Sequence, residues 1–267
     1  MMRRAIASLR RQDWTNVAIE LAVVVLGVFL GVQASNWNSE RETDRKAADF
    51  SERLATDLRE EAWGYQLQVT YYGEVLENAR RTADALSGRS PLSDEALLIN
   101  AYRATQYNGN TRRRATYDEL TSTGEIGLIR DPGLRDLAMR TYATGMLDDI
   151  VRDAQRAEYR VAFRRAIPHE VQRALGEACG DKVVPVGDYA AIPHTLDYPC
   201  ATGLPAEDIA RSAAILRGDG EFPPLLRLRI ADLQTDLGNL TQYNDKDLWA
   251  PLRKLAGRPQ PSSATPR

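Results

Sequence analysis

Two histidines and two cysteines are the residues of this sequence best suited to metal or nucleophilic chemistry. His169-Glu170 begins like the HExxH motif of zinc proteases, in which two histidines one helical turn apart bind the metal and the glutamate acts as a base. Arg173 stands where the second histidine would be. The chain also contains no GxSxG, P-loop or dinucleotide-binding pattern. We therefore expect no catalytic residue and no cofactor, and we predict that the protein is not an enzyme.

Cys179 and Cys200 are the only cysteines of the chain. In an oxidising compartment such a pair favours one disulfide, which here would close a loop of about 20 residues and contribute about 3 kcal/mol in the chain-entropy model. In the cytoplasm the two would be free thiols. His194 lies between them, but the spacing of the three residues matches no common zinc site. The predicted disulfide therefore depends on where the chain is located.

The element that fixes the location is an apolar stretch at residues 17–37. Its uninterrupted apolar core runs from Leu21 to Val32, and Trp14 and Trp37 flank it. The two tryptophans are about 35 Å apart along a helix, which is enough to cross a hydrocarbon core of about 30 Å. Tryptophan prefers the interface between membrane and water. We therefore predict a transmembrane helix over residues 17–37, with Trp14 and Trp37 as interface anchors.

The predicted span contains two polar residues, Glu20 and Gln33, and two glycines in a GxxxG pattern, Gly27 and Gly31. A carboxylate inside a membrane is costly and often marks a function or a partner. The alternative is that Glu20 lies near the interface and reaches the headgroups. GxxxG allows two helices to approach closely, so the glycines predict a packing face, although this spacing also arises by chance.

The charges that flank the span predict its orientation. Close to the span the basic residues are equal in number, with Arg10 and Arg11 on one side and Arg41 and Arg45 on the other. The N-terminal segment of residues 1–16 is short, however, and carries four arginines with only one aspartate, whereas residues 38–61 are net acidic. Because basic flanks stay in the cytoplasm, we expect a bacterial inner-membrane protein with a cytoplasmic N-terminus and a periplasmic main domain. Two alternatives stay open. Val32-Gln33-Ala34 before Ser35 is an acceptable signal-peptidase site, and a short apolar helix is also found buried in soluble proteins.

The N-terminal stretch also resembles a known pattern. ELAVVVLGVFLGVQASNWN is similar to the signature of a family of uncharacterised bacterial single-pass inner-membrane proteins. The matching positions are Glu20, the run Leu26 to Gly31, Gln33, Asn36, Trp37 and Asn38, with a second, weaker match from Tyr117 to Ile129. The resemblance implies one membrane helix followed by a helical extracytoplasmic domain. It implies no activity.

Beyond the span the pattern is helical. Apolar positions recur at steps of three and four from Phe50 to Leu86 without a proline, so the membrane helix is expected to continue as a stalk. Asp131-Pro132 marks another helix start. Further helices are expected over Asp94–Tyr107 with Ser93 as N-cap, Tyr117–Thr123, Pro132–Ile167, His169–Ala178, Pro205–Leu216 and Pro223–Lys254, with an irregular loop at residues 179–203.

Two side-chain clusters have alternative interpretations. Trp63, Tyr65, Tyr71 and Tyr72 suit core packing better than a platform for a ligand. The basic triplet Arg112–Arg114 would suit an anionic group, but a solvated helix start is the more common role of such a run.

With 267 residues and a net charge of −2, the chain can form one domain or at most two, and it has no basic surface that predicts nucleic-acid binding. We predict an all-α protein with a short basic cytoplasmic segment (1–16), a transmembrane helix (17–37), a helical periplasmic bundle (38–256) and a disordered tail (257–267). The expected partners are the lipid bilayer and either a second copy or another envelope protein. The leading hypothesis is a membrane-anchored, non-enzymatic interaction, scaffold or regulatory protein. The alternative is a periplasmic small-molecule sensor that acts through a partner.

Overall fold

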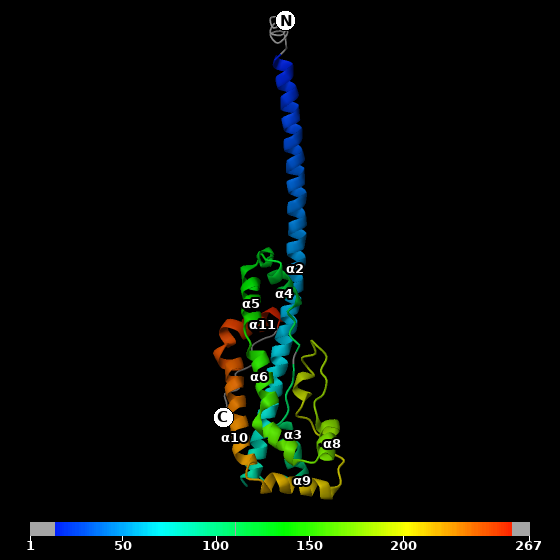
Figure 1. Cartoon of the computed structure of the whole chain (residues 1–267), viewed down its shortest axis with the longest axis vertical. Helices are drawn as coiled ribbons and strands as arrows, with labels where there is room; N and C mark the ends of the chain where they lie inside the picture. The colour runs from blue at the N-terminus through cyan, green and yellow to red at the C-terminus, as the bar shows by residue number, and fades with distance from the viewer. Residues whose placement is uncertain (1–13, 110, 258–267) are drawn as a thin grey trace, which may run out of the picture.

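The structure is a computed structural model that describes residues 14–109 and 111–257. Within these residues every regular element is a helix and none is a strand, so the predicted all-α fold is confirmed. The predicted basic segment 1–16 and the predicted tail 257–267 lie almost entirely outside the described residues. Figure 1 shows one long helix that projects from a bundle of shorter ones.

The long helix, α2 (Trp14–Leu86), has 73 residues and is about 110 Å long at 1.5 Å per residue. The predicted continuation of the apolar stretch into a stalk is therefore confirmed. From Ala18 to Lys46 its side chains are exposed, and from Ala47 onward one face is buried in the bundle. That face carries the predicted stripe of Phe50, Leu54, Leu58, Ala62, Tyr65, Tyr72, Leu76 and Ala79.

Two large hydrophobic cores and a small third cluster, formed by Trp63, Leu67 and Ile192, lie along the buried part of α2. In the proximal core, nearer the exposed end of α2, Tyr65 stacks on Trp249 with ring centroids 4.1 Å apart. Trp63, Tyr71 and Tyr72 are also buried, which confirms that the aromatic cluster packs in the interior. Other elements of the proximal core include α4 (Ala115–Ser122), the 3-10 turn η1 (Ile126–Leu128), α5 (Pro132–Ala143), α6 (Met146–Arg156) and α11 (Ala250–Leu255).

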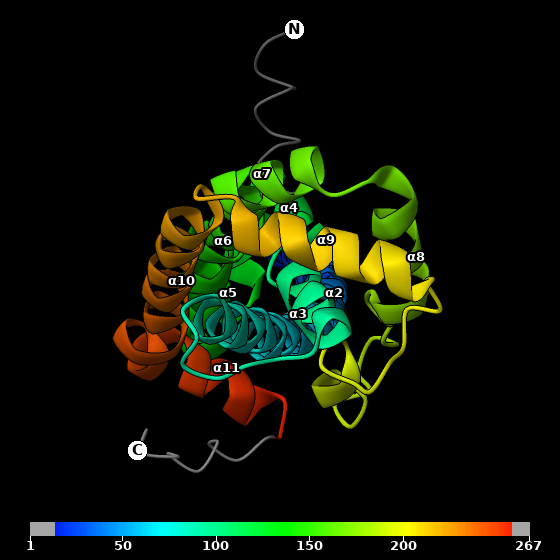
Figure 2. The same cartoon turned by 90° about the horizontal axis from the view of Figure 1, so that it is seen from below.

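The distal core joins the C-terminal end of α2 to a second group of helices. Tyr159, Phe163 and Phe222 are its largest buried side chains. Its elements are α3 (Asp94–Arg103), α7 (Glu158–Ala166), α8 (His169–Cys179) and α9 (Ala206–Gly218), while α10 (Phe222–Gly238) runs along α2 and contributes to both cores. Seen from below, α9 lies across the distal end of the bundle (Figure 2). The loop at residues 179–203 contains only the short 3-10 turn η2 (Ile192–His194).

The predicted helix over Pro132–Ile167 is wrong as a single element, because α5, α6 and α7 replace it. The first break, at Thr144 and Gly145, has a sequence signal, since both residues are weak helix formers. The second break, at Ala157, has none. There the backbone leaves the helical region (φ −51°, ψ 126°), and Tyr159, two residues later, lies in the distal core. Tertiary packing therefore decides this break.

The predicted helix over Pro223–Lys254 is also interrupted. After α10 the chain forms two π-helical turns, η3 (Asn239–Tyr243) and η4 (Asp245–Trp249), before α11. Trp249, at the end of the second π-helical turn, stacks on Tyr65 in the core. The helix predicted over Asp94–Tyr107 ends earlier, at Arg103, but the Ser93 cap is confirmed, because its hydroxyl accepts a bond from Ala96 N at 3.2 Å.

Candidate functional site

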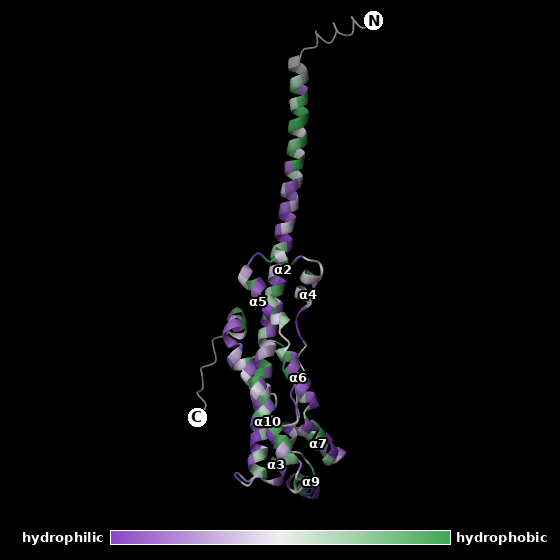
Figure 3. Cartoon of the chain, turned by 60° about the vertical axis from the view of Figure 1, so that its left-hand side comes forward, coloured by the Kyte–Doolittle hydropathy of each residue, from purple (hydrophilic) through white to green (hydrophobic). Residues whose placement is uncertain are grey.

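Within the described residues, the free part of α2 carries a long continuous run of exposed large apolar side chains. The helix contains a window long and apolar enough to cross a membrane, with 0% of it buried against the rest of the chain. Figure 3 shows this hydrophobic segment well away from the bundle. A soluble protein would leave such a surface in water at a large cost. The surface therefore needs a covering that the described chain does not supply.

The residues predicted in the span lie along this free segment. Glu20 and Gln33 are exposed. A side chain added at Gly27 or Gly31 would meet nothing within 4 Å, so neither glycine is needed for packing against the part of the chain that the structure describes. Trp37 is 59% exposed, and the Arg41 guanidinium lies 3.6 Å from its ring centroid. Trp14 is the first residue of α2, but its side chain lies outside the described residues.

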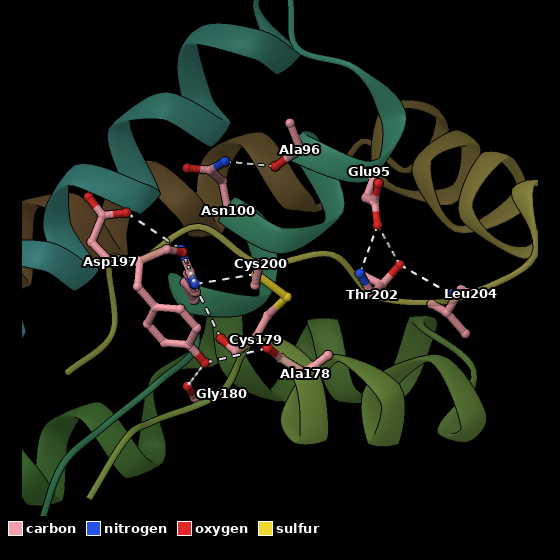
Figure 4. The surroundings of a disulfide bond; sticks show 12 residues. Glu95, Ala96, Asn100, Ala178, Cys179, Gly180, Asp197, Cys200, Thr202 and Leu204 are labelled. Atoms are coloured by element: carbon pink, nitrogen blue, oxygen red, sulfur yellow. Dashed lines mark hydrogen bonds and ion pairs between the residues drawn. A yellow bond between two sulfur atoms is a disulfide. The ribbon is translucent and has the colours of Figure 1, made fainter. Parts of the chain in front are cut away.

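The disulfide between Cys179 and Cys200 is present, as predicted, with Cα atoms 5.5 Å apart. Figure 4 shows how it links the end of α8 to the loop beside α3. Arg103 of α3, only 4% exposed, donates from Nε to Cys179 O (3.3 Å) and from Nη2 to Tyr198 O (2.8 Å). Because both sulfurs are bonded to each other, they offer no thiolates to a metal with His194. Among the described residues no group of acidic, histidine and cysteine side chains is arranged to hold a metal ion.

The disulfide-closed loop is also fixed to α2. Glu74 accepts the backbone N–H groups of Leu196 (3.0 Å) and Asp197 (2.9 Å) through one carboxylate oxygen, and the Tyr71 hydroxyl donates to Asp181 at 2.8 Å. Burial raises the pKa of both Glu74 and Asp181, and their hydrogen bonds partly oppose this. The loop is thus held from two sides, by the disulfide and by polar groups of α2.

A buried ion pair joins α2 to the segment before α4. Glu61 is 1% exposed and Arg112 is 10% exposed, with Arg112 Nε 2.8 Å from Glu61 Oε2. The other Glu61 oxygen accepts the backbone N–H of Arg113. Arg112 Nη2 donates to Thr141 O at 2.9 Å, and its Nη1 lies 3.3 Å from Asp148. The pair therefore connects α2, α5 and α6.

Only part of the triplet Arg112–Arg114 fits the favoured role of a solvated helix start: Arg114 is the exposed N-cap of α4 and Arg113 is 39% exposed, whereas Arg112 is only 10% exposed. Arg113 pairs with Glu60 at 2.8 Å, and Arg114 pairs with Asp118 at the start of α4. Each arginine already has a carboxylate partner, so none is left unpaired for an anionic ligand, and only the Arg112 pair is buried. The sequence showed the charges but not the carboxylates that lie opposite them.

Two clefts border opposite faces of α7. One, of about 570 Å³, is lined by side chains of both charges, including Glu158, Arg165 and Asp219. The other, which we name the distal cleft, has a volume of about 320 Å³. It is lined by Tyr102, Thr105, Gln106, Arg160, Phe163, Arg164, His169, Gln172 and Arg173. His169, the residue that began the rejected zinc motif, thus lies among arginines in a concave surface.

Four aspartates on α6 and α10 predict a pH-dependent stability. Burial and the charges of Asp153, Asp232 and Asp149 raise the pKa of Asp236 to about 6. The folded state therefore binds the proton more tightly than the unfolded chain, so stability falls as the pH rises from about 4 to about 6. Above about pH 6 the ionised Asp236 lowers the folding stability by its full amount. Solvent screening limits this loss to about 1–2 kcal/mol.

Asp236→Asn is thus expected to stabilise the protein by about 1–2 kcal/mol at neutral pH and to change little near pH 4. Chemical denaturation at the two pH values measures the difference. Asp232→Asn, at an exposed neighbour on the same helix, is the control and should give a smaller gain, because it removes only one of the repelling charges. An equal gain from Asp236→Asn at both pH values would contradict the assignment.

Comparison with known proteins identifies no relative for this arrangement. No protein-family model matches the chain, no curated protein is significantly similar to it, and no solved structure shares its fold at a significant level. The resemblance of the N-terminal stretch to a family of bacterial inner-membrane proteins stays a prediction, and function has to be argued from the chain's own surfaces.

Proposed function

We propose that this protein is a membrane-anchored, non-enzymatic interaction protein of the bacterial envelope. The observation that carries the proposal is the continuity of α2, in which an exposed apolar segment and the central helix of a packed bundle form one rod. Such a rod holds the bundle at a fixed distance from a bilayer. We place the N-terminus in the cytoplasm and the bundle in the periplasm, because the short N-terminal segment carries four arginines and only one aspartate.

The proposed partner is a second copy or another envelope protein. Gly27 and Gly31 lie on one face of the span, where their small size allows close approach of another helix. If α2 packs through this face, a tagged copy will capture an untagged copy, or another membrane protein, in stoichiometric amount from a detergent extract. A chain that is extracted only as a monodisperse monomer would contradict the proposal.

Matched variants distinguish packing through the glycine face of the span from non-specific hydrophobic association. Gly27→Leu with Gly31→Leu adds bulk to the glycine face and should abolish capture. Val25→Leu with Val32→Leu adds bulk on the other side of the helix, at 3.6 residues per turn, and should leave capture intact. Both variants should remain in the membrane fraction after an alkaline wash, because both keep the apolar length.

The second proposed function is that of a periplasmic sensor for a small molecule. The distal cleft is the observation that favours it, because a concave site with converging polar groups is a typical ligand site. A sensor of this architecture needs a partner to carry the signal, so the two proposals share the same anchored geometry.

A further inference from the structure

The distal cleft collects positive charge from two helices. Arg160 and Arg164 lie on α7, and His169 and Arg173 lie on α8. In each helix the two residues are four positions apart and therefore share a face. The corner at Ile167-Pro168 turns the chain so that both faces border one cleft. Within the described chain no carboxylate lines it.

The two α7 arginines are not neutralised. Neither Arg160 nor Arg164 forms an ion pair with any described residue. Arg160 is half-buried, its Nη1 donates to Thr105 O at 2.8 Å, and its guanidinium lies 4.7 Å from the Tyr107 ring centroid. Burial, followed by the charge of Arg164, lowers the pKa of Arg160. Like charges at this spacing destabilise a helix, and a bound anion would remove that cost.

Two carboxylates that interact with arginines of the cleft, Asp181 and Glu177, lie outside its lining. Asp181 accepts the Tyr71 hydroxyl at 2.8 Å, although its pKa still responds to the charge of Arg160. Glu177 approaches Arg173 to 3.8 Å on the exposed side of α8. Neither carboxylate is part of the lining, so the interior of the cleft keeps an excess of positive charge.

The walls of the cleft are fixed by packing and hydrogen bonds. Gln172 donates to Ile167 O at 2.7 Å and to Arg164 O at 3.0 Å, which holds the corner between the two helices. Tyr102 and Phe163 pack with ring centroids 6.3 Å apart. A rigid wall of this kind lowers the entropy cost of ordering side chains around a ligand.

We propose that the distal cleft binds phosphate or the phosphate group of a small soluble phosphomonoester. Arginine forks bind phosphate oxygens with paired, charge-assisted hydrogen bonds. Donors that reach the cleft from two helices suit a tetrahedral anion better than a planar carboxylate. The N-terminus of α8, a helix of 11 residues, adds favourable dipole charge at His169.

The ligand is soluble rather than a headgroup of the anchoring membrane. The apolar core of the span ends near Val32, and Arg160 of the cleft interacts electrostatically with Tyr71 of α2. The helical rise between Val32 and Tyr71 is about 60 Å, beyond the reach of a headgroup. This inference rests on the sensor function and supplies its ligand class. It does not depend on the proposed second copy or envelope partner, because phosphate binding is measured on the purified protein alone.

The test is calorimetric titration of the purified full chain in a non-ionic detergent with inorganic phosphate. We expect saturable binding at one site per chain that weakens with added salt. Arg164→Ala should weaken it about tenfold or more, since this exposed arginine makes no described structural contact through its guanidinium. Arg165→Ala, at the next residue but lining the opposite cleft, is the matched control and should stay within about twofold.

Three results would overturn the assignment. The first is the absence of saturable binding up to about 10 mM phosphate. The second is an equal loss in Arg164→Ala and Arg165→Ala, which would indicate general charge screening. The third is succinate binding as tightly as phosphate, which would show that the cleft does not select the tetrahedral anion. Thermal unfolding of each variant confirms that it is folded, and all three results are independent of the capture experiment.

Discussion

Glu61→Ala is expected to destabilise the bundle by about 3–5 kcal/mol, because it leaves the Arg112 guanidinium buried without its closest counter-charge. The same change removes the acceptor for the backbone N–H of Arg113, and an unsatisfied buried donor has a further cost. Thr141 O and Asp148 still contact Arg112, and this keeps the effect within the stated range. Denaturant unfolding monitored by helical circular dichroism measures the change.

The adjacent residue provides the control for Glu61. Glu60 pairs with Arg113 at the same distance of 2.8 Å, but both side chains are 39% exposed. Because exposed pairs contribute little, Glu60→Ala should cost less than about 1 kcal/mol. The double variant Glu61→Ala with Arg112→Ala should be less destabilised than the sum of the two single variants. Equal costs at positions 60 and 61 would show that burial of the pair does not matter.

The elements that the sequence predicts correctly are those set by local patterns. The stripe from Phe50 to Leu76 identifies α2, because steps of three and four place these residues on one face. Ser93 and Asp131 identify two helix starts, and their side chains accept the expected backbone bonds. The single pair of cysteines leaves only one intrachain disulfide. In each case the residues that determine the feature are close together in the sequence or, as with the two cysteines, have only one possible partner.

The features that the sequence does not reveal depend on distant partners. The break at Ala157 and the π-helical turns before Trp249 are set by packing against residues far away in the chain. In the sequence, Glu61 cannot be distinguished from the many carboxylates on exposed helix faces. Only the structure shows that it is buried and paired with Arg112. The distal cleft had a weak local signal, since Arg160-Arg164 and His169-Arg173 repeat a four-residue spacing. Only the corner between α7 and α8 brings the two pairs together.

We expect the second large loss of stability when the disulfide is removed. The bond joins residues separated by 21 positions, so its loss should cost about 3 kcal/mol by the chain-entropy model. For a chain of this size that lowers the midpoint of thermal unfolding by about 6–12 °C. Cys179→Ala with Cys200→Ala is the appropriate variant, because alanine adds no polar group at the fully buried Cys179.

Thermal unfolding measured with and without reductant shows whether the effect comes from the disulfide itself. The wild-type protein should unfold at a lower temperature after reduction, whereas the alanine variant should unfold at the same temperature with and without reductant. A wild-type midpoint that does not change on reduction, with free thiols verified by alkylation, would show that Glu74 and Arg103 hold the loop without the bond.

The same bond also tests where the bundle is located. A disulfide of this kind persists in the periplasm and is reduced in the cytoplasm, so its state in cells reports the proposed orientation of α2. The intact mass of unreduced, membrane-extracted protein should be lower by two hydrogens than that of the reduced chain, and it should include the apolar segment. A mass that begins at Ser35 would contradict the anchor, and free thiols in freshly trapped protein would contradict the periplasmic orientation. Stability and topology are therefore linked through Cys179 and Cys200.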